Sequence, residues 1–267
     1  MMLAVPCAAA RAQEAVLEAL EVSAPAGRIP CRLYVPPGPG PHPAVIMLPD
    51  QHGPDLREIF HAERLVDDGI AVLIVHVWAP RGIVPEDAPA GETDPAALLP
   101  DLRAAAAALR ADPRIHADRI GVWGFGLGGA TAMLARLFAD PVPGPVVAFY
   151  PPCRELQTML RRVATASHLP PLLVIAAEED AAGWPATCAS LLEEAGEGPQ
   201  TARLIAVPGA TYAFDTMPPM SPVIEQSWPG PSGGSRHVRS DILAAEEART
   251  RAGWFLATAL DAPAARR

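Results

Sequence analysis

Short apolar runs alternate with longer amphipathic stretches along most of this chain. Six of these runs are rich in branched side chains, at residues 44–48, 70–77, 120–124, 146–150, 172–176 and 202–207. Short continuous apolar runs are typical of strands that are buried on both faces of a parallel sheet. Before them, residues 16–23 and 28–35 alternate apolar and polar positions, which favours an antiparallel pair at the sheet edge. Together these runs predict an eight-stranded, mostly parallel sheet.

The stretches between the strands predict helices, so both faces of the sheet should be covered. Helical patterns span residues 55–68, 95–111, 127–139, 185–195 and 240–260. The last pattern places apolar residues on one stripe at spacings of three and four, which predicts a helix packed on the sheet. Residues 217–234 are rich in Pro, Gly and Ser and predict a long loop before that helix. We therefore expect a single α/β domain over residues 13–267.

Composition narrows the classes of partner. The chain has 267 residues, half of them hydrophobic, and a formal net charge of −9 without a block of like charge. Nothing resembles the basic stripe that binds phosphates or anionic lipids, so we expect no nucleic-acid or membrane partner. No apolar run reaches the roughly 18–20 residues that a transmembrane helix needs.

Residues 1–12 form a separate N-terminal segment. Met1 to Ala10 is apolar, and Ala10, Arg11 and Ala12 make a small-x-small site of the kind that signal peptidase cuts. No basic residue precedes the apolar stretch, so a disordered N-terminus is the alternative to a signal peptide. The pattern predicts a periplasmic or secreted protein that begins at Gln13; a cytoplasmic protein with an intact N-terminus is the other reading.

The four cysteines lack the spacing of a zinc site, and the histidines show no metal-ligand pattern. We therefore predict no metal. Cys153 follows one predicted strand and Cys188 lies in the helix after the next strand, so both should lie near one edge of the sheet. In an oxidising compartment they can form a disulfide, and otherwise they are two buried thiols.

The sequence IGVWGFGLGGA, at residues 120–130, runs from a strand through closely spaced glycines into a helix. This is the pattern of the nucleophile elbow GxSxG, in which Gly124 and Gly128 take the outer glycine positions and Gly126 takes the nucleophile position. A dinucleotide-binding loop is the competing interpretation. That loop should follow the first strand and be followed by an acidic residue after the second, and neither condition is met. We predict no cofactor.

Three segments, in this order and at this spacing, resemble the dienelactone hydrolase family of α/β-hydrolases. They are GFGLGG at residues 124–129, LLVIAAEED ending at Asp180, and PGATYAFD at residues 208–215. Members typically read GFCxGG or GFSxGG at the first segment and PGAxHxFD at the last. The resemblance covers residues 28–260 and extends to secreted members through PRG at residues 80–82 and the pair Cys153 and Cys188. It implies an α/β-hydrolase fold and, in intact members, hydrolysis of esters or lactones.

The chain departs from this family at the reactive positions. Gly126 replaces the family's Ser or Cys, Tyr212 replaces its His, and only Asp180 matches its catalytic acid. Pro49 and Asp50 replace the His-Gly pair of the oxyanion loop. The resemblance leaves the backbone N–H of Leu127 as one oxyanion donor, with Gln51 as a candidate for the second.

A glycine has no atom with which to attack a carbonyl, and a phenol with an ordinary pKa near 10 is a poor base at neutral pH. Tyr212 can donate a hydrogen bond to Asp180 but cannot replace an imidazole. We therefore expect a hydrolase homologue that has lost its activity and binds a small carbonyl or carboxylate ligand, or a protein partner, in the retained pocket.

An active enzyme is the alternative, with a water activated by Asp180 or His52 beside the Leu127 donor, and a purely structural role is the third. His237, which we expect at the start of the last helix, would reach the site only if the preceding loop folded back. Cys153 is a weaker candidate for a displaced nucleophile, because no histidine is predicted beside it.

Overall fold

The computed structural model describes residues 15–83, 94–137, 144–160, 169–180, 183–216, 225–229 and 235–261. The predicted signal segment at residues 1–12 lies outside this range. In the part of the chain that is described, no helix is both long and apolar enough to cross a membrane.

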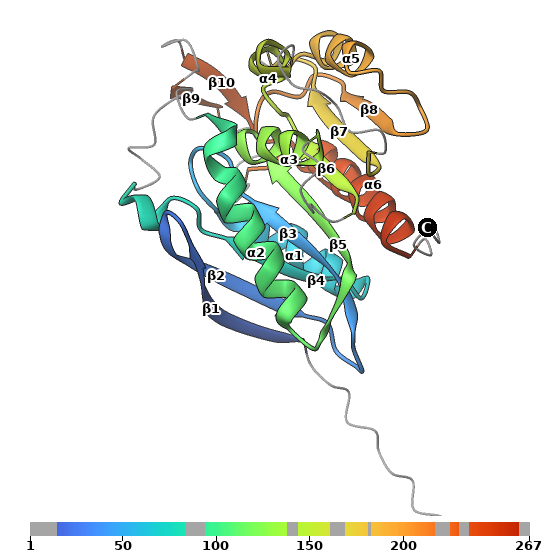
Figure 1. Cartoon of the computed structure of the whole chain (residues 1–267). Coiled ribbons are helices and arrows are strands. Elements are labelled where there is room, and N and C mark those ends of the chain that lie inside the picture. The colour runs from blue at the N-terminus through green and yellow to red at the C-terminus, as the bar shows by residue number, and fades with distance from the viewer. Residues whose placement is uncertain are drawn as a thin grey trace, which may run out of the picture.

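The main sheet has eight strands in the order β1-β2-β4-β3-β5-β6-β7-β8 (Figure 1). Strand β2 pairs antiparallel with β1 and with β4, and all the later pairings are parallel. The predicted eight-stranded, mostly parallel sheet is therefore confirmed. The strands are β1 Val16–Ala24, β2 Gly27–Val35, β3 His42–Leu48, β4 Ala71–Val75, β5 Ile115–Phe125, β6 Val146–Phe149, β7 Leu172–Ala177 and β8 Ala202–Val207.

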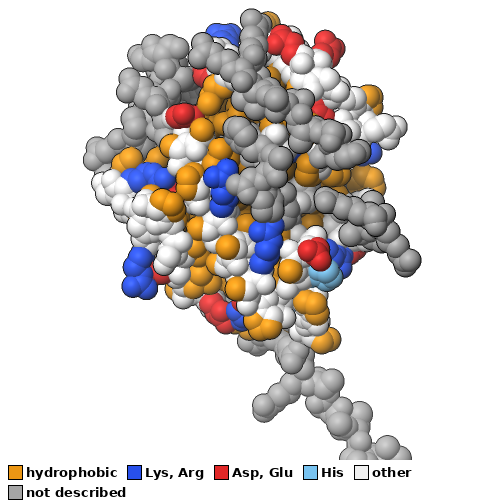
Figure 2. Space-filling model, in the orientation of Figure 1, with side chains coloured by type: hydrophobic (Ala, Val, Ile, Leu, Met, Phe, Trp, Pro, Cys, Tyr) orange, Lys and Arg blue, Asp and Glu red, His pale blue; other side chains and the backbone are white. Residues whose placement is uncertain are grey.

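Helices cover both faces of the sheet (Figure 1). Alternate residues of a strand point to opposite faces, and β3 shows this directly: Ile46 belongs to one apolar cluster, while Val45 and Met47 belong to another. The first cluster is completed by α2 Leu99–Ala111, α3 Leu127–Leu137, α4 Cys153–Leu160 and α5 Pro185–Glu194, and the second by α1 Leu56–Asp67 and α6 Ile242–Asp261. Short 3-10 turns form at η1 Ala79–Arg81 and η3 Pro95–Leu98. On the face seen in Figure 2, side chains of both charges are scattered among apolar ones, without a single-sign patch in the part drawn in colour.

Two predictions about the chain after β8 were wrong. Residues 217–234 were expected to form a loop, but strands β9 Glu225–Pro229 and β10 Ser235–Arg239 pair as an antiparallel two-stranded sheet. His237 lies in β10 and does not begin the last helix, which starts at Ile242. Neither strand has the alternating apolar pattern of a half-buried strand, so its sequence carries no strand signal. Helix α4 was also not predicted, because its eight residues are too few for a periodic pattern.

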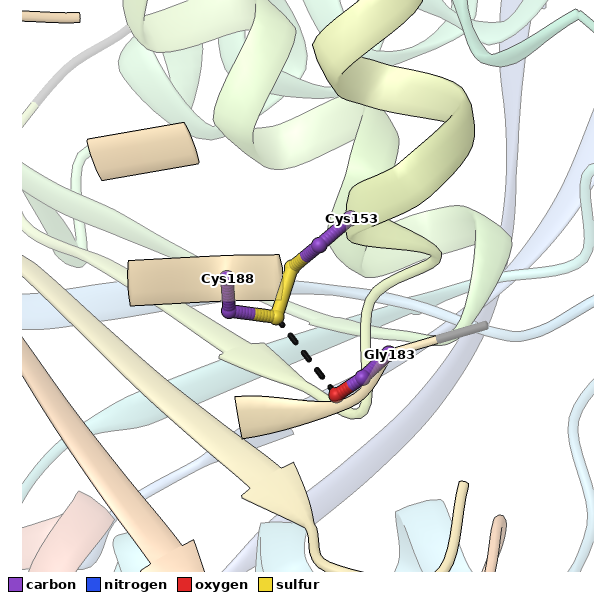
Figure 3. The surroundings of a disulfide bond; sticks show 3 residues. All are labelled: Cys153, Gly183 and Cys188. Atoms are coloured by element: carbon purple, nitrogen blue, oxygen red, sulfur yellow. Dashed lines mark hydrogen bonds between the residues drawn. A yellow bond between two sulfur atoms is a disulfide. The ribbon is translucent and has the colours of Figure 1, made fainter. Parts of the chain in front are cut away.

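Cys153 and Cys188 form a disulfide that joins α4 to α5, with their Cα atoms 5.1 Å apart (Figure 3). Of the two alternatives that the sequence left open, the structure has the bridged pair. The Sγ atom of Cys188 lies 3.5 Å from the Gly183 carbonyl oxygen. The disulfide therefore fixes α4 against α5, and Cys153 is no free nucleophile.

Candidate functional site

The elbow between β5 and α3 contains glycines that lie very close to neighbouring backbone atoms. Gly126 has a φ of +48°, a conformation that L side chains rarely adopt. A Cβ atom on Gly124 would lie 2.2 Å from the Gly128 backbone, and one on Gly128 would lie 2.4 Å from the Leu48 carbonyl oxygen. These two positions must be glycine for strand and helix to cross here. The backbone thus has the sharp strand-turn-helix that the motif predicts.

Tyr212 fills the space above Gly126. Its side chain is buried, and a Cβ atom on Gly126 would lie only 2.4 Å from the Tyr212 hydroxyl oxygen and 3.1 Å from the Asp50 Cβ. The volume in which a nucleophilic side chain would begin is therefore occupied by a phenol. The glycine and the tyrosine fit each other sterically, a relation that their separate appearance in the sequence does not reveal.

The phenol is hydrogen-bonded within the loop after β3. Its Oη lies 3.0 Å from Gln51 Oε1 and 3.3 Å from Asp50 Oδ2, and it has one proton to donate between them. Gln51 Nε2 lies 3.3 Å from His52 Nε2, and the His52 backbone N–H donates to Asp50 Oδ1 at 2.8 Å. The structure brings Gln51 and His52 together and places Gln51 against Tyr212, a contact that the sequence did not predict. The Gln51 side chain, however, is engaged by the phenol.

The other predicted site residues lie at the same edge of the sheet. Leu127 is the first residue of α3, where a backbone N–H has no partner within the helix. Asp180 follows β7, is 3% exposed, and donates its own N–H to the Ala177 carbonyl at 3.2 Å. Its Oδ2 is packed so closely that a Cβ atom on Gly183 would lie 2.9 Å from it.

A buried charged network beneath the elbow was not predicted. Arg57 of α1 is fully buried; its Nη2 lies 3.2 Å from Asp50 Oδ2 and 3.1 Å from Asp55 Oδ2. Its Nη1 donates to the Tyr150 hydroxyl at 2.8 Å, and its guanidinium carbon lies 5.3 Å from the centre of the Phe125 ring. Burial opposes the charge of Arg57, but the attraction of Asp50, Tyr150 and Asp55 outweighs it and raises the pKa of the guanidinium.

The network continues to the far side of the core. The Tyr150 hydroxyl donates to Asp215 Oδ1 at 2.7 Å, and Asp215 Oδ2 lies 2.9 Å from His61 Nε2. Burial lowers the pKa of His61, so its ring is neutral at pH 7. Burial also works against the Asp215 charge, yet the His61 hydrogen bond and the Arg57 charge hold the pKa of Asp215 below its usual value. A chain of polar contacts thus runs from Tyr212 through Asp50, Arg57 and Tyr150 to this pair.

Backbone strain is concentrated around the same contacts. Tyr150 and Ala213 have φ values of 38° and 51°, and they are the non-glycine residues at positive φ in the described ranges. Such conformations cost about 1–3 kcal/mol each and persist where surrounding contacts determine them. They flank the phenol on both sides, because Ala213 follows Tyr212 and the Tyr150 and Tyr212 rings lie 4.9 Å apart between centres.

A sequence signal for the network exists in α1. Arg57 and His61 are four residues apart on the stripe that also carries Leu65, and all three are buried. Charged and imidazole groups on the buried stripe of an amphipathic helix need partners in the core. Among the described residues, no group of three His, Cys, Asp or Glu side chains is arranged to hold a metal ion.

The contact above Gly126 predicts an energetic coupling. We expect Gly126→Ser to destabilise the protein by about 2–4 kcal/mol, because the new Cβ overlaps the Tyr212 hydroxyl and occupies a strained φ. In a Tyr212→Phe background the cost of the same change should fall by about 1 kcal/mol or more. Urea unfolding of the four proteins of this double-mutant cycle measures the coupling. Additive costs would mean that the hydroxyl does not occupy this space.

Glu58 predicts a specific dependence of stability on pH. It accepts the Asp55 backbone N–H at 2.8 Å in a capping box, and burial raises its pKa from the ordinary glutamate range to about 8. A carboxyl group with a raised pKa in the folded state contributes less stability as the pH rises from the unfolded to the folded pKa. Between pH 6 and pH 9 the parent should therefore lose roughly 1–3 kcal/mol more than Glu58→Gln, whose amide can still accept the capping bond. Parallel loss in both proteins, measured by urea unfolding, would show that Glu58 is ionised throughout.

Comparisons with known proteins agree with this geometry. A model of the dienelactone hydrolase family matches residues 29–226. Among solved structures, a dienelactone hydrolase from Anabaena variabilis has 18% identity and a TM-score of 0.63 and covers 92% of this chain and 99% of its own. A dienelactone hydrolase-like promiscuous phosphotriesterase from metagenomic libraries has 18% identity, a TM-score of 0.63 and coverages of 91% and 98%.

A Pyrobaculum calidifontis esterase has 18% identity and a TM-score of 0.62, with coverages of 93% of this chain and 86% of its own. At these identities the solved structures establish the fold alone. No curated protein sequence matches the chain significantly. Because the family model covers most of the chain, this protein belongs to the dienelactone hydrolase family.

Proposed function

We propose that this chain is a member of the family that no longer hydrolyses esters and that binds a small carbonyl or carboxylate ligand at the elbow. The observation that carries the proposal is the Tyr212 hydroxyl 2.4 Å from where a Gly126 side chain would begin. The position has lost its nucleophile, and a neighbouring side chain has taken the vacated volume. A chain that had lost only its nucleophilic side chain at residue 126 would not need a tyrosine at residue 212 to fill the space.

The hydrogen bonds of the side chains around Tyr212 also argue against a substitute nucleophile activated by one of them. In the family reaction a base must accept the proton of the attacking group, and then return it to the leaving group. With Gln51 Oε1 accepting from Tyr212, Gln51 Nε2 donates to His52 Nε2, which occupies the lone pair that a base would use. Asp50 is not available as a base either, because its carboxylate accepts a hydrogen bond from the His52 backbone N–H and lies against the Arg57 guanidinium. These contacts favour binding over activation of a water.

Ligand binding would use what the elbow retains. The first turn of α3 presents the Leu127 N–H at the positive end of the helix dipole, which favours an oxygen that carries negative charge. The partly exposed His52 lies in the loop after β3, in contact with Gln51. The group that suits the Leu127 N–H donor is a carbonyl or carboxylate oxygen of the ligand.

Hydrolysis of a panel of p-nitrophenyl acetate and lactones tests the proposal. We expect the parent and Gly126→Ser to be inactive, and Gly126→Ser with Tyr212→His to gain at least ~100-fold over the parent, since it restores a nucleophile and a base. Gly126→Ser with Tyr212→Phe is the matched control, because it removes the hydroxyl that overlaps the new side chain but supplies no base.

If the parent itself turns over and Asp180→Asn abolishes that activity, the alternative of an activated water is correct. The parent is also titrated with γ-butyrolactone by calorimetry, and absence of binding contradicts the ligand part of the proposal.

We also propose that the protein is periplasmic or secreted. The disulfide between Cys153 and Cys188 supports this, because disulfides persist mainly in oxidising compartments. N-terminal sequencing of the protein from its host should find Gln13 as the first residue. An intact Met1 would contradict export by cleavage at the predicted site.

A further inference from the structure

A second cavity lies at the carboxyl end of β4, beside the start of α1. Its volume is about 400 Å3, within the roughly 300–1,000 Å3 typical of small-molecule sites. Asp55, Leu56 and Ile59 line it from α1 and the preceding residue, and Arg32, Ile74 and His76 line it from the sheet. The cavity is not part of the elbow, which involves Asp50 and Gln51 further back along the same loop.

The sheet side of the cavity is basic. Arg32 and Ile74 are register partners in the β2 and β4 pair, and His76 lies two residues beyond Ile74, so all three project from the same face of the sheet. Arg32 is exposed, and the charge of its guanidinium also acts on the Tyr34 hydroxyl. Burial, with the nearby Arg32 charge, lowers the pKa of His76 and leaves a neutral imidazole with one N–H to donate at pH 7. These two side chains offer a carboxylate a cation and a hydrogen-bond donor.

The helix side of the cavity is acidic. Asp55 is the N-cap of α1, where its Oδ1 accepts the Arg57 backbone N–H at 2.7 Å, and its side chain is 35% exposed. Behind it, the carboxyl groups of Asp50 and Asp55 both lie against the one guanidinium of Arg57, while burial raises the pKa of Glu58 to about 8 and so favours its neutral form. This group therefore has more acids than cations, and Asp55 is the acid that reaches the cavity. An ammonium group placed here would gain a partner.

Apolar side chains line both sides of the cavity. Ile74 of the sheet is buried, Ile59 of α1 is half-buried, and Leu56 of α1 is 44% exposed, which leaves apolar surface that a ligand can cover. We propose that this cavity binds a small zwitterion with an apolar side chain, of the size of a branched-chain amino acid. Its carboxylate pairs with Arg32 and His76, its ammonium pairs with Asp55, and its side chain covers Leu56, Ile59 and Ile74. The proposal does not depend on the function of the elbow.

Calorimetric titration with three probes that share one branched chain tests this site. They are L-leucine, 4-methylpentanoate, which has the carboxylate alone, and 3-methylbutylamine, which has the amine alone. A charge-assisted hydrogen bond contributes about 1.5–3 kcal/mol, so each single-charge probe should bind at least ~10-fold more weakly than leucine. Equal binding of leucine and either single-charge probe, or no binding of leucine, would overturn the proposal.

Variants separate the site from general changes of charge. Arg32→Gln and Asp55→Asn should each weaken leucine binding at least ~10-fold, and Asn still caps a helix, so α1 is preserved. Arg28→Gln is the matched control, because Arg28 is an exposed arginine of the same strand that pairs with Glu21 away from the cavity. Leucine affinity should be unchanged in this control. Loss of affinity in Arg28→Gln equal to that in Arg32→Gln would show a non-specific charge effect and contradict the site.

Discussion

The contact between the Tyr212 hydroxyl and the space above Gly126 is the constraint around which the site is arranged. It can exist only because residue 126 has no Cβ, which would lie 2.4 Å from the hydroxyl oxygen. The phenol then needs an acceptor in a buried place, and the Gln51 and Asp50 side chains supply it. The steric fit of Tyr212 over Gly126 therefore accounts for the hydrogen bonds of the phenol to the loop after β3. One of these acceptors is the buried carboxylate of Asp50, whose negative charge needs a positive partner.

Arg57 balances the negative charge of Asp50, but its own buried guanidinium also needs partners. A buried guanidinium without partners would be severely destabilising, and here it contacts Asp50, Asp55 and the Tyr150 hydroxyl. Tyr150 in turn donates a hydrogen bond to Asp215, whose other carboxylate oxygen lies within hydrogen-bonding distance of His61. The polar network thus closes within the core, between the aromatic rings of Phe125 and Phe149, and links the elbow to α1.

Much of the scaffold could be predicted from the sequence. Apolar runs specify strands buried on both faces, and the glycines of GFGLGG specify a close crossing whose distances the structure confirms at Gly124 and Gly128. The network could not be predicted, because Arg57, Asp50 and Asp215 come from segments whose proximity only the folded sheet creates. The β9 and β10 pair was missed for a different reason: its strands are five residues each, and their sequences lack an alternating pattern of apolar and polar residues.

The most direct test of this account is a crystal structure of the parent protein that resolves the elbow. We predict the Tyr212 ring turned inward, with its hydroxyl oxygen within hydrogen-bonding distance of Gln51 Oε1 and directly above the Gly126 Cα. A Tyr212 ring turned away from Gly126, leaving the space above the Gly126 Cα empty, would contradict the claim that the Tyr212 hydroxyl occupies the position of the nucleophilic side chain.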